Sequence, residues 1–144
     1  MTSDRIHVAR FTELTPAVLY GIVKLRQDVF VVEQACAYDD MDGRDAEPDA
    51  QHLWIEADGM VAAALRLLGE HGGSHRIGRI VTVPAHRGRG LAGRLIEHAV
   101  ALAGRPVVLS AQGHLQHWYE RFGFSVSGES WVDAGIPHVP MRLA

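Results

Sequence analysis

One stretch of the sequence, Arg87 to Arg94 (RGRGLAGR), constrains the fold more than any other. It lies between an apolar, β-branched run that Pro84 ends and a segment, 91–103, whose apolar residues recur at helical spacing. Glycines without a Cβ let successive backbone amides converge, and the following helix directs its free N–H groups to the same point. The pattern predicts a pyrophosphate-binding turn between a strand and a helix. The alternative is a tight turn that only permits close helix packing.

The apolar periodicity of the remaining chain predicts one mixed sheet. Alternating or continuous apolar runs indicate strands at 6–11, 53–57, 61–67, 76–83, 107–109, 124–132 and 138–143. Three- and four-residue spacing indicates helices at 16–34, 91–103 and 113–122. This order mixes antiparallel hairpins with one strand–helix–strand crossover. It predicts an α/β (α+β) fold with a central, mostly antiparallel sheet of about six or seven strands and helices on both faces.

Length and composition bound the class of protein. A chain of 144 residues fits one domain, 1–144. Its net charge of −3 disfavours nucleic acid as a partner, and no apolar run reaches the roughly 18 residues that a membrane span needs. The lone cysteine, Cys36, excludes an internal disulfide and indicates a reducing, cytoplasmic location. Histidines and carboxylates show no metal-ligand spacing, so no metal is expected.

The glycine-rich turn, placed after an apolar strand, resembles the signature Arg/Gln-x-x-Gly-x-Gly/Ala of the Gcn5-related N-acetyltransferases (GNAT). The turn lacks the Gly-Lys-Ser/Thr ending of a P-loop. The resemblance implies acetyl-CoA as co-substrate. It implies that the turn holds the CoA pyrophosphate and that the preceding strand lies along pantetheine. The residues so implied are Arg87, Gly88, Arg89, Gly90, Leu91, Ala92, Gly93 and Arg94 for the turn, and Ile80, Val81 and Val83 for the strand.

Within that family, several further segments resemble the ElaA-like subgroup. They are spread over most of the chain, which a chance motif would not be. The segments are Val29–Gln34 (VFVVEQ), Asp40–Gly43 (DMDG), His52–Trp54 (HLW), Leu109–Gln112 (LSAQ), Trp118–Phe124 (WYERFGF) and Gly135–Val139 (GIPHV).

Acetyl transfer to an amine requires a proton donor for the departing thiolate and a base for the attacking amine. Tyr119 matches the family tyrosine that faces the CoA sulfur, and its phenol is a suitable donor; the alternative is a tyrosine that only packs in the core. Glu33 and His138 are the preferred bases. With nine histidines in the chain, His52, His114, His117 or a bound water are alternatives.

Two further segments leave alternatives open. Many family members carry an asparagine after the fifth strand that binds the cofactor arm; here Ser110 or Gln112 stands in that stretch. The acidic loop 35–50 either attracts a cationic amine or is a solvated loop without a binding role.

The function expected from these features is transfer of an acetyl group from acetyl-CoA to a primary amine by direct attack in a ternary complex. The acceptor is a small molecule or a peptide, and a homodimer is compatible with such a small domain. The alternative is a non-catalytic acyl-CoA sensor on the same fold. The sequence retains both Tyr119 and the complete turn, which favours the enzyme.

Overall fold

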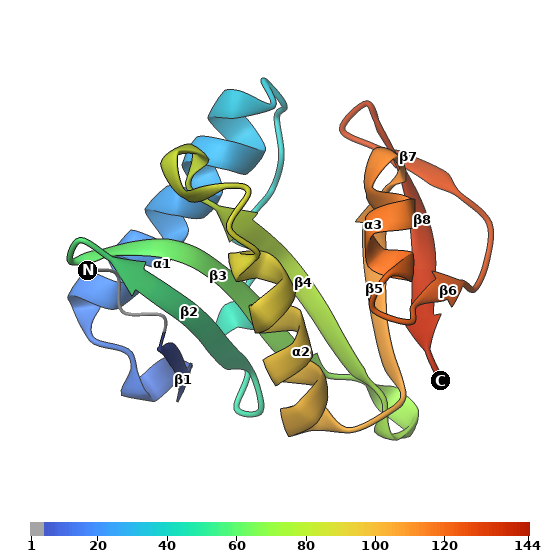
Figure 1. The fold of residues 1–144 in the computed structure, drawn as a ribbon, viewed down its shortest axis with the longest axis horizontal. Helices are drawn as coiled ribbons and strands as arrows, with labels where there is room; N and C mark the ends of the chain where they lie inside the picture. The colour runs from blue at the N-terminus through green and yellow to red at the C-terminus, as the bar shows by residue number, and fades with distance from the viewer. Residues whose placement is uncertain (1–4) are drawn as a thin grey trace.

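The computed structural model describes residues 5–144, and within this range eight strands form one mixed sheet (Figure 1). The spatial order is β1-β2-β3-β4-β5-β8-β6, with β7 paired to β8. All neighbouring strands are antiparallel except β4 and β5. The strands are β1 (Ile6–Arg10), β2 (Gln51–Ala57), β3 (Met60–Gly69), β4 (His75–Thr82), β5 (Val107–Gln112), β6 (Ser125–Val126), β7 (Trp131–Asp133) and β8 (Ile136–Leu143).

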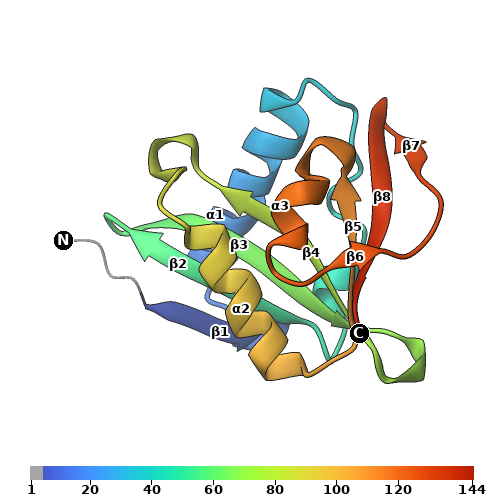
Figure 2. The ribbon, with the colours of Figure 1, turned by 45° about the vertical axis from the view of Figure 1, so that its right-hand side comes forward.

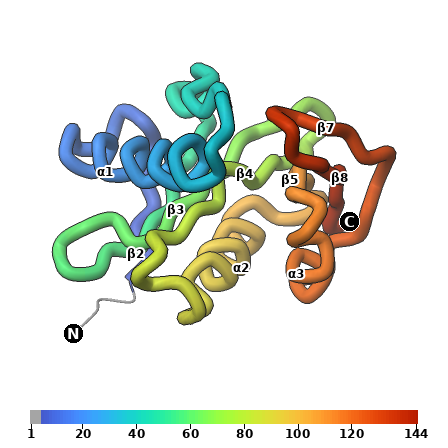
Figure 3. The backbone as a smooth tube through the Cα atoms, turned by 90° about the horizontal axis from the view of Figure 1, so that it is seen from above, coloured from blue at the N-terminus to red at the C-terminus, as the bar shows by residue number. Residues whose placement is uncertain are grey.

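Helices cover both faces of the sheet, as the sequence predicted. Helix α1 (Pro16–Arg26) lies on one face, whereas α2 (Leu91–Ala103) and α3 (Gln116–Glu120) lie on the other (Figures 2 and 3). The larger core forms under α2 and α3 and the smaller one under α1. The hydroxyl of Thr15 caps α1 by accepting a hydrogen bond from the Val18 amide at 3.2 Å.

The helix that begins at Pro16 continues to Glu33, but its last part, Gln27–Glu33, is π-helical. The wider turns are seen in the hydrogen bonds from Gln34 N to Val29 O and from Cys36 N to Val31 O, both 3.1 Å. Each of these bonds spans five residues, one more than in an α-helix. The π-helical segment therefore rotates the end of the helix and brings Phe30, Glu33 and Gln34 to the surface of the cleft described below.

The hairpin between β2 and β3 forms at Asp58-Gly59, a residue pair that favours a two-residue turn. Both residues have left-handed backbone conformations, with φ values of 54° and 75°, as a two-residue type I′ turn requires. A second turn, at Gly72-Gly73, joins β3 to β4.

The region 124–132 is not the single strand that the sequence predicted. It forms two short strands, β6 and β7, separated by exposed residues 127–130. The partner strand β8 carries Pro140 opposite this gap, and proline has no amide hydrogen to donate to the ladder. The sheet accordingly has eight strands in the described range instead of six or seven. The helix expected over 113–122 is also shorter, because Gly113–Leu115 forms a 3₁₀ turn before α3.

The two halves of the sheet separate between β4 and β5. These strands pair only at His75–Val107 and Arg76–Val108, and beyond these two positions they diverge (Figure 1). A β-bulge lies in β4 at the point of divergence: Ala64 pairs with Val81 and Arg66 with Gly78, so β4 has one extra residue. Arg79, within the bulge, has a φ of 52°. The bulge bends β4 away from β5 and opens the centre of the sheet.

Candidate active site

The separation of β4 from β5 creates a cleft of about 730 Å³ that passes between the two halves of the sheet. Its walls come from β4, β5, the π-helical segment, the loop 34–38, α3 and the β7–β8 hairpin. Tyr119, Glu33, His138, Ser110, Ile80 and Val81, all singled out from the sequence, line it together. Tertiary structure thus brings residues up to 105 positions apart (33 to 138) into one cavity.

The glycine-rich turn lies at the α2 end of this cleft, where Arg87 and Ala92 belong to its lining. Gly88 and Gly90 have φ values of 81° and 73°, a conformation that residues with a Cβ rarely adopt. Within residues 5–144, the backbone amides of Gly88 through Gly93 hydrogen-bond to no other group, and no side chain caps α2. Six free N–H groups at a helix N-terminus form a concave anion-binding site.

The site fits a pyrophosphate, because a Cβ at Gly88 or Gly90 would meet open space within 4 Å while the surrounding amides are unpaired. Leu91 and Gly93 can contribute only backbone groups. The Leu91 side chain is buried in the core, and Gly93 packs against the ring of Phe122. Arg89 is exposed and donates a hydrogen bond to His86 Nδ1 at 3.0 Å, and Arg94 is exposed on the first turn of α2.

The edge of β4 that faces β5 suits an extended arm such as pantetheine. Val83 donates its amide to Ala62 of β3, so Val81 also faces β3, and the backbone groups of Ile80 and Thr82 face the cleft. The carbonyl of Thr82 accepts a hydrogen bond from Arg87 Nε at 3.1 Å. Val83 itself packs between the two cores and does not line the cleft.

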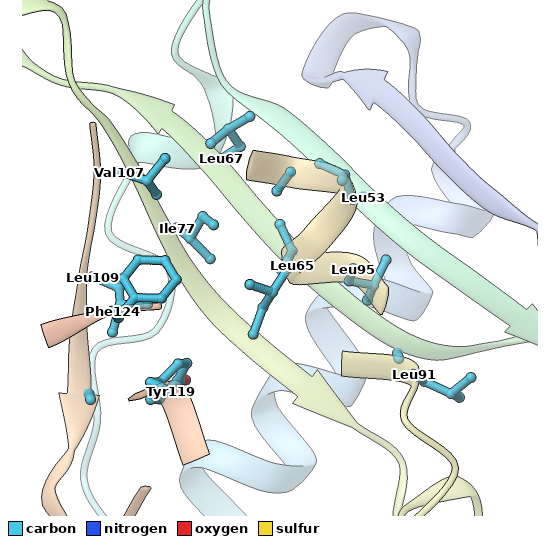
Figure 4. Packing of buried hydrophobic residues seen from close by; sticks show 14 of the residues in the cluster. Leu53, Leu65, Leu67, Ile77, Leu91, Leu95, Val107, Leu109, Tyr119 and Phe124 are labelled. Carbon is cyan, nitrogen blue, oxygen red and sulfur yellow. The ribbon is translucent and has the colours of Figure 1, made fainter. Parts of the chain in front are cut away.

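Tyr119 points from α3 into the core beside Leu109 and Phe124, on the side of the sheet that carries α2 (Figure 4). It is 7% exposed, and burial raises the pKa of its phenol to about 12. The hydroxyl therefore keeps its proton throughout the physiological range. No hydrogen-bond partner for it exists among residues 5–144, which leaves it able to donate to a group within the cleft.

Glu33 and Arg87, predicted to be a base and a phosphate ligand, form an ion pair with each other. Two hydrogen bonds of 2.8 and 2.9 Å join the guanidinium to the carboxylate across the mouth of the cleft. The hydrogen bonds from Arg87 lower the pKa of Glu33, so the carboxylate is a weaker base than an isolated glutamate.

His138 has the geometry that a base requires. Its Nδ1 lies 2.8 Å from the carbonyl oxygen of Ile136, which can only accept, so Nδ1 carries the hydrogen and Nε2 keeps a lone pair. The ring stacks on Trp131 with centroids 5.7 Å apart. Of the alternative histidines, His114 lines the cleft. His52 is buried outside it, and His117 is exposed and contacts Glu120.

Ser110 and Gln112 both line the cleft from β5, and each already has a partner. Ser110 Oγ accepts a hydrogen bond from Arg76 at 3.1 Å. Gln112 exchanges two amide hydrogen bonds with Gln34, of 3.3 and 3.4 Å, which join the π-helical segment to β5 across the cleft.

The acidic loop 35–50 is only partly solvated, because three of its carboxylates belong to a network of ion pairs. Asp40 and Asp45 are buried, and with Asp42 they pair with three arginines, Arg26, Arg66 and Arg79. Within this network three positive groups balance three negative groups, whereas Asp39 and Asp49 of the same loop are exposed. The signal in the sequence was the isolated arginine within the apolar run Val61–Leu68, since a charge in a buried strand needs a partner.

Within residues 5–144, no helix is long and apolar enough to cross a membrane. The same residues contain no cluster of three or more His, Cys, Asp or Glu side chains placed to hold a metal ion.

Comparison with known proteins agrees with this architecture. The family model described as "Acetyltransferase (GNAT) domain" matches residues 21–144. A UPF0039 protein of Mycobacterium tuberculosis is 45% identical over 134 residues, covering 90% of this chain and 86% of that protein. Protein ElaA of Escherichia coli is 35% identical over 137 residues, covering 90% of each chain.

Solved structures give the same result. The crystal structure of an acyl-CoA N-acyltransferase from Pseudomonas aeruginosa superposes with a TM-score of 0.91 at 42% identity, over 97% of this chain and 99% of that chain. The crystal structure of E. coli ElaA superposes with a TM-score of 0.87 at 32% identity, over 97% and 99%. The acyl-homoserine lactone synthase LasI shares the fold at 20% identity, with a TM-score of 0.75 over 96% and 88%.

Proposed function

The chain belongs to the acetyltransferase (GNAT) domain family, and from this membership we propose that it transfers an acetyl group from acetyl-CoA to a primary amine by direct attack in a ternary complex. The observation that carries the proposal is the convergence on one cleft of the unpaired amides of Gly88–Gly93, the open edge of β4 and the protonated phenol of Tyr119. The pyrophosphate of acetyl-CoA would meet the turn amides, its pantetheine arm would lie along the edge of β4, and the leaving thiolate would meet the phenol of Tyr119.

In this mechanism the turn amides bind the pyrophosphate, with Arg89 and Arg94 adding charge at the helix start. Ile80 and Thr82 hold the pantetheine arm through their backbone groups. Acetyl-CoA supplies the activated thioester. Tyr119 donates a hydrogen bond to the sulfur as negative charge develops there. Because its pKa of about 12 exceeds the reference value of about 8.5 for a thiol, the phenol stabilises the leaving thiolate by a hydrogen bond and keeps its own proton.

The attacking amine must lose a proton. We assign this step to Nε2 of His138, which has a free lone pair in the cleft, and keep Glu33 as the second candidate. The two assignments separate by experiment. Under the first, His138→Gln lowers kcat by about 10²-fold or more, and Glu33→Gln does not. If Glu33→Gln lowers kcat and His138→Gln does not, Glu33 is the base.

The first test is thermal unfolding with and without acetyl-CoA. Ligand at 100 times its dissociation constant adds about 2.7 kcal/mol of stability, which raises the midpoint by several degrees. Arg89→Glu should abolish the shift, and Arg142→Glu, an exposed position of β8 away from the cleft, should retain it. Absence of a shift at millimolar acetyl-CoA in the wild type would contradict the proposal.

The second candidate function is a non-catalytic acyl-CoA sensor on the same fold. It predicts the same thermal shift but no release of CoA thiol with any amine. The hydroxyl of Tyr119 favours the enzyme, because the residue lines the cleft and its hydroxyl makes no hydrogen bond to the described residues, which leaves it available to a leaving thiolate.

We further propose that residues 1–144 act as one acetyltransferase domain in the cytoplasm. The support is the single sheet across the described residues and the lone cysteine. The outer strands β1 and β6 offer edges through which a homodimer could form.

A further inference from the structure

The end of the cleft where β4 and β5 meet contains charged groups that acetyl-CoA does not require. Arg66 of β3 and Arg76 of β4 both line the cleft there. The glycine-rich turn follows the end of β4 at Thr82. Arg76 lies six residues before Thr82, about 20 Å of strand, and Arg66 lies opposite Gly78, four residues before Thr82, about 13 Å. The cofactor's phosphates therefore cannot reach these two arginines while they occupy the turn.

Between the two arginines lies Gly78, which leaves an opening in the surface of the sheet. In the β3–β4 ladder Arg66 is opposite Gly78, and Arg76 is two residues further along β4, so all three share one face. A Cβ built on Gly78 would meet nothing within 4 Å, and its φ lies outside the left-handed region. Neither packing nor backbone conformation therefore explains why position 78 is a glycine. A small group bound over this position would explain it.

Arg66 supplies a buried donor without a partner. The residue is 4% exposed, and Asp42 and Asp45 accept hydrogen bonds from its two Nη atoms at 2.8 to 3.3 Å. Its Nε–H is buried and has no hydrogen-bond partner in the described part of the chain. An unpaired buried donor on a charged group is destabilising unless a ligand accepts a hydrogen bond from it.

Arg76 supplies further donors. Its Nε binds Glu70 at 2.7 Å and its Nη1 binds Ser110 at 3.1 Å, and both contacts hold the guanidinium in place. Nη2 hydrogen-bonds to nothing among residues 5–144. Planar guanidinium groups with N–H donors free suit the two oxygens of a carboxylate.

We propose that this end of the cleft binds a carboxylate of the reacting substrate, placed over Gly78 and held by Arg66 Nε and Arg76 Nη2. The site then selects an amine that also bears a carboxylate, as amino acids do, and it does not select polyamines. Asp133 lines the same cleft from β7 and offers a negative charge for the incoming ammonium. The carboxylate could instead belong to the acyl donor, as the free carboxylate of a dicarboxylic acyl-CoA does. The proposal rests on the proposed transferase function.

The experiment measures affinity by calorimetry. In the acceptor arm, the protein saturated with CoA is titrated with phenylalanine against phenethylamine, and with lysine against cadaverine. In the donor arm, the free protein is titrated with succinyl-CoA against butyryl-CoA. We expect the carboxylate-bearing member to bind about tenfold more tightly in one arm, and the arm identifies which substrate carries the group.

Two variants test the residues. Arg76→Gln removes the charge, and Gly78→Ala fills the opening without touching the arginines; each should reduce the preference to about onefold. The matched control is Arg142→Gln, which should leave it unchanged. Arg66 is not substituted, because its two other nitrogens pair with buried aspartates and the variant could unfold.

Equal affinities within every pair, a preference that survives both variants, or no binding of any carboxylate-bearing probe at millimolar concentration would overturn the proposal. The thermal shift with acetyl-CoA is measured on the same preparations. Loss of that shift would contradict the transferase function itself. A normal shift without a carboxylate preference would remove only the carboxylate site.

Discussion

At the scale of single residues, the proposed role of Tyr119 is to donate a hydrogen bond to the leaving thiolate, and burial keeps its phenol protonated for this role. Tyr119→Phe removes the hydroxyl and keeps the ring that packs on Trp118 and Phe124. We expect CoA release at saturating substrate to fall by about 10²-fold or more, because the hydrogen bond to the leaving thiolate is lost. The thermal shift with acetyl-CoA should persist, since the turn is intact. Unchanged turnover would assign the donor role elsewhere.

His52 allows a prediction of how stability depends on pH. Burial lowers its pKa below the ordinary value of 6.5, and its Nε2 lies 3.0 Å from the Asp45 carbonyl. The unfolded chain therefore takes up this proton first as pH falls. The stabilising contribution is complete above pH 6.5 and decreases below it, down to the lowered pKa.

His52→Gln keeps a side-chain donor for that carbonyl but does not titrate. The wild type should lose more stability than the variant when urea unfolding is compared at pH 7.5 and in steps below 6.5. Parallel curves for the two proteins would show that His52 does not contribute.

At the scale of elements, the position of α2 against α3 determines the phosphate-binding turn. A Cβ on Gly93 would lie 3.0 and 3.2 Å from two atoms of the Phe122 ring. Gly93→Ala should therefore force the start of α2 away, at a cost of about 1–3 kcal/mol that improved helix propensity offsets by up to about 1 kcal/mol. Acetyl-CoA affinity should fall as the amides shift.

The matched control for Gly93→Ala is Ala101→Gly, on the exposed side of the same helix. It should lower stability by about 1 kcal/mol through helix propensity and leave acetyl-CoA affinity unchanged. If both variants bind acetyl-CoA equally well, the packing of Gly93 on Phe122 does not set the geometry of the turn. Urea unfolding and calorimetry with acetyl-CoA measure the two effects separately.

At the scale of the whole molecule, the buried network of arginines and aspartates joins α1, the loop 35–50, β3 and β4. Arg26 is 1% exposed and contacts Asp40 and Asp45 at 2.7 to 3.1 Å. Arg26→Met should lower the free energy of unfolding by about 3–5 kcal/mol, because it leaves two buried carboxylates short of a partner.

The control for Arg26 is Lys24, two residues earlier on the same helix. Lys24 pairs with Asp28 at 2.8 Å, but both side chains are exposed. Lys24→Met should leave the free energy of unfolding nearly unchanged, because solvent screens this exposed pair. A small effect of Arg26→Met in urea unfolding would mean that Arg66 and Arg79 suffice for the carboxylates.

The sequence by itself determined the strands, helices and turns that depend on residues close together along the chain. Apolar periodicity predicted most strands and helices, Asp58-Gly59 fixed the hairpin, and the glycines of 88–93 fixed the turn that precedes α2. These features follow from backbone conformation and hydrogen bonds within a few residues, so local residue types are sufficient to predict them.

Only the tertiary structure decided what depends on distant partners. The bulge at Arg79 and the separation of β4 from β5 arise from pairing with β3, and the Glu33–Arg87 pair joins residues 54 apart. The ion pairs of the acidic loop were not predicted for the same reason, since its arginine partners lie on α1, β3 and β4. Burial and charge pairing are properties of the packed molecule, because solvent removal acts between segments that meet only after folding.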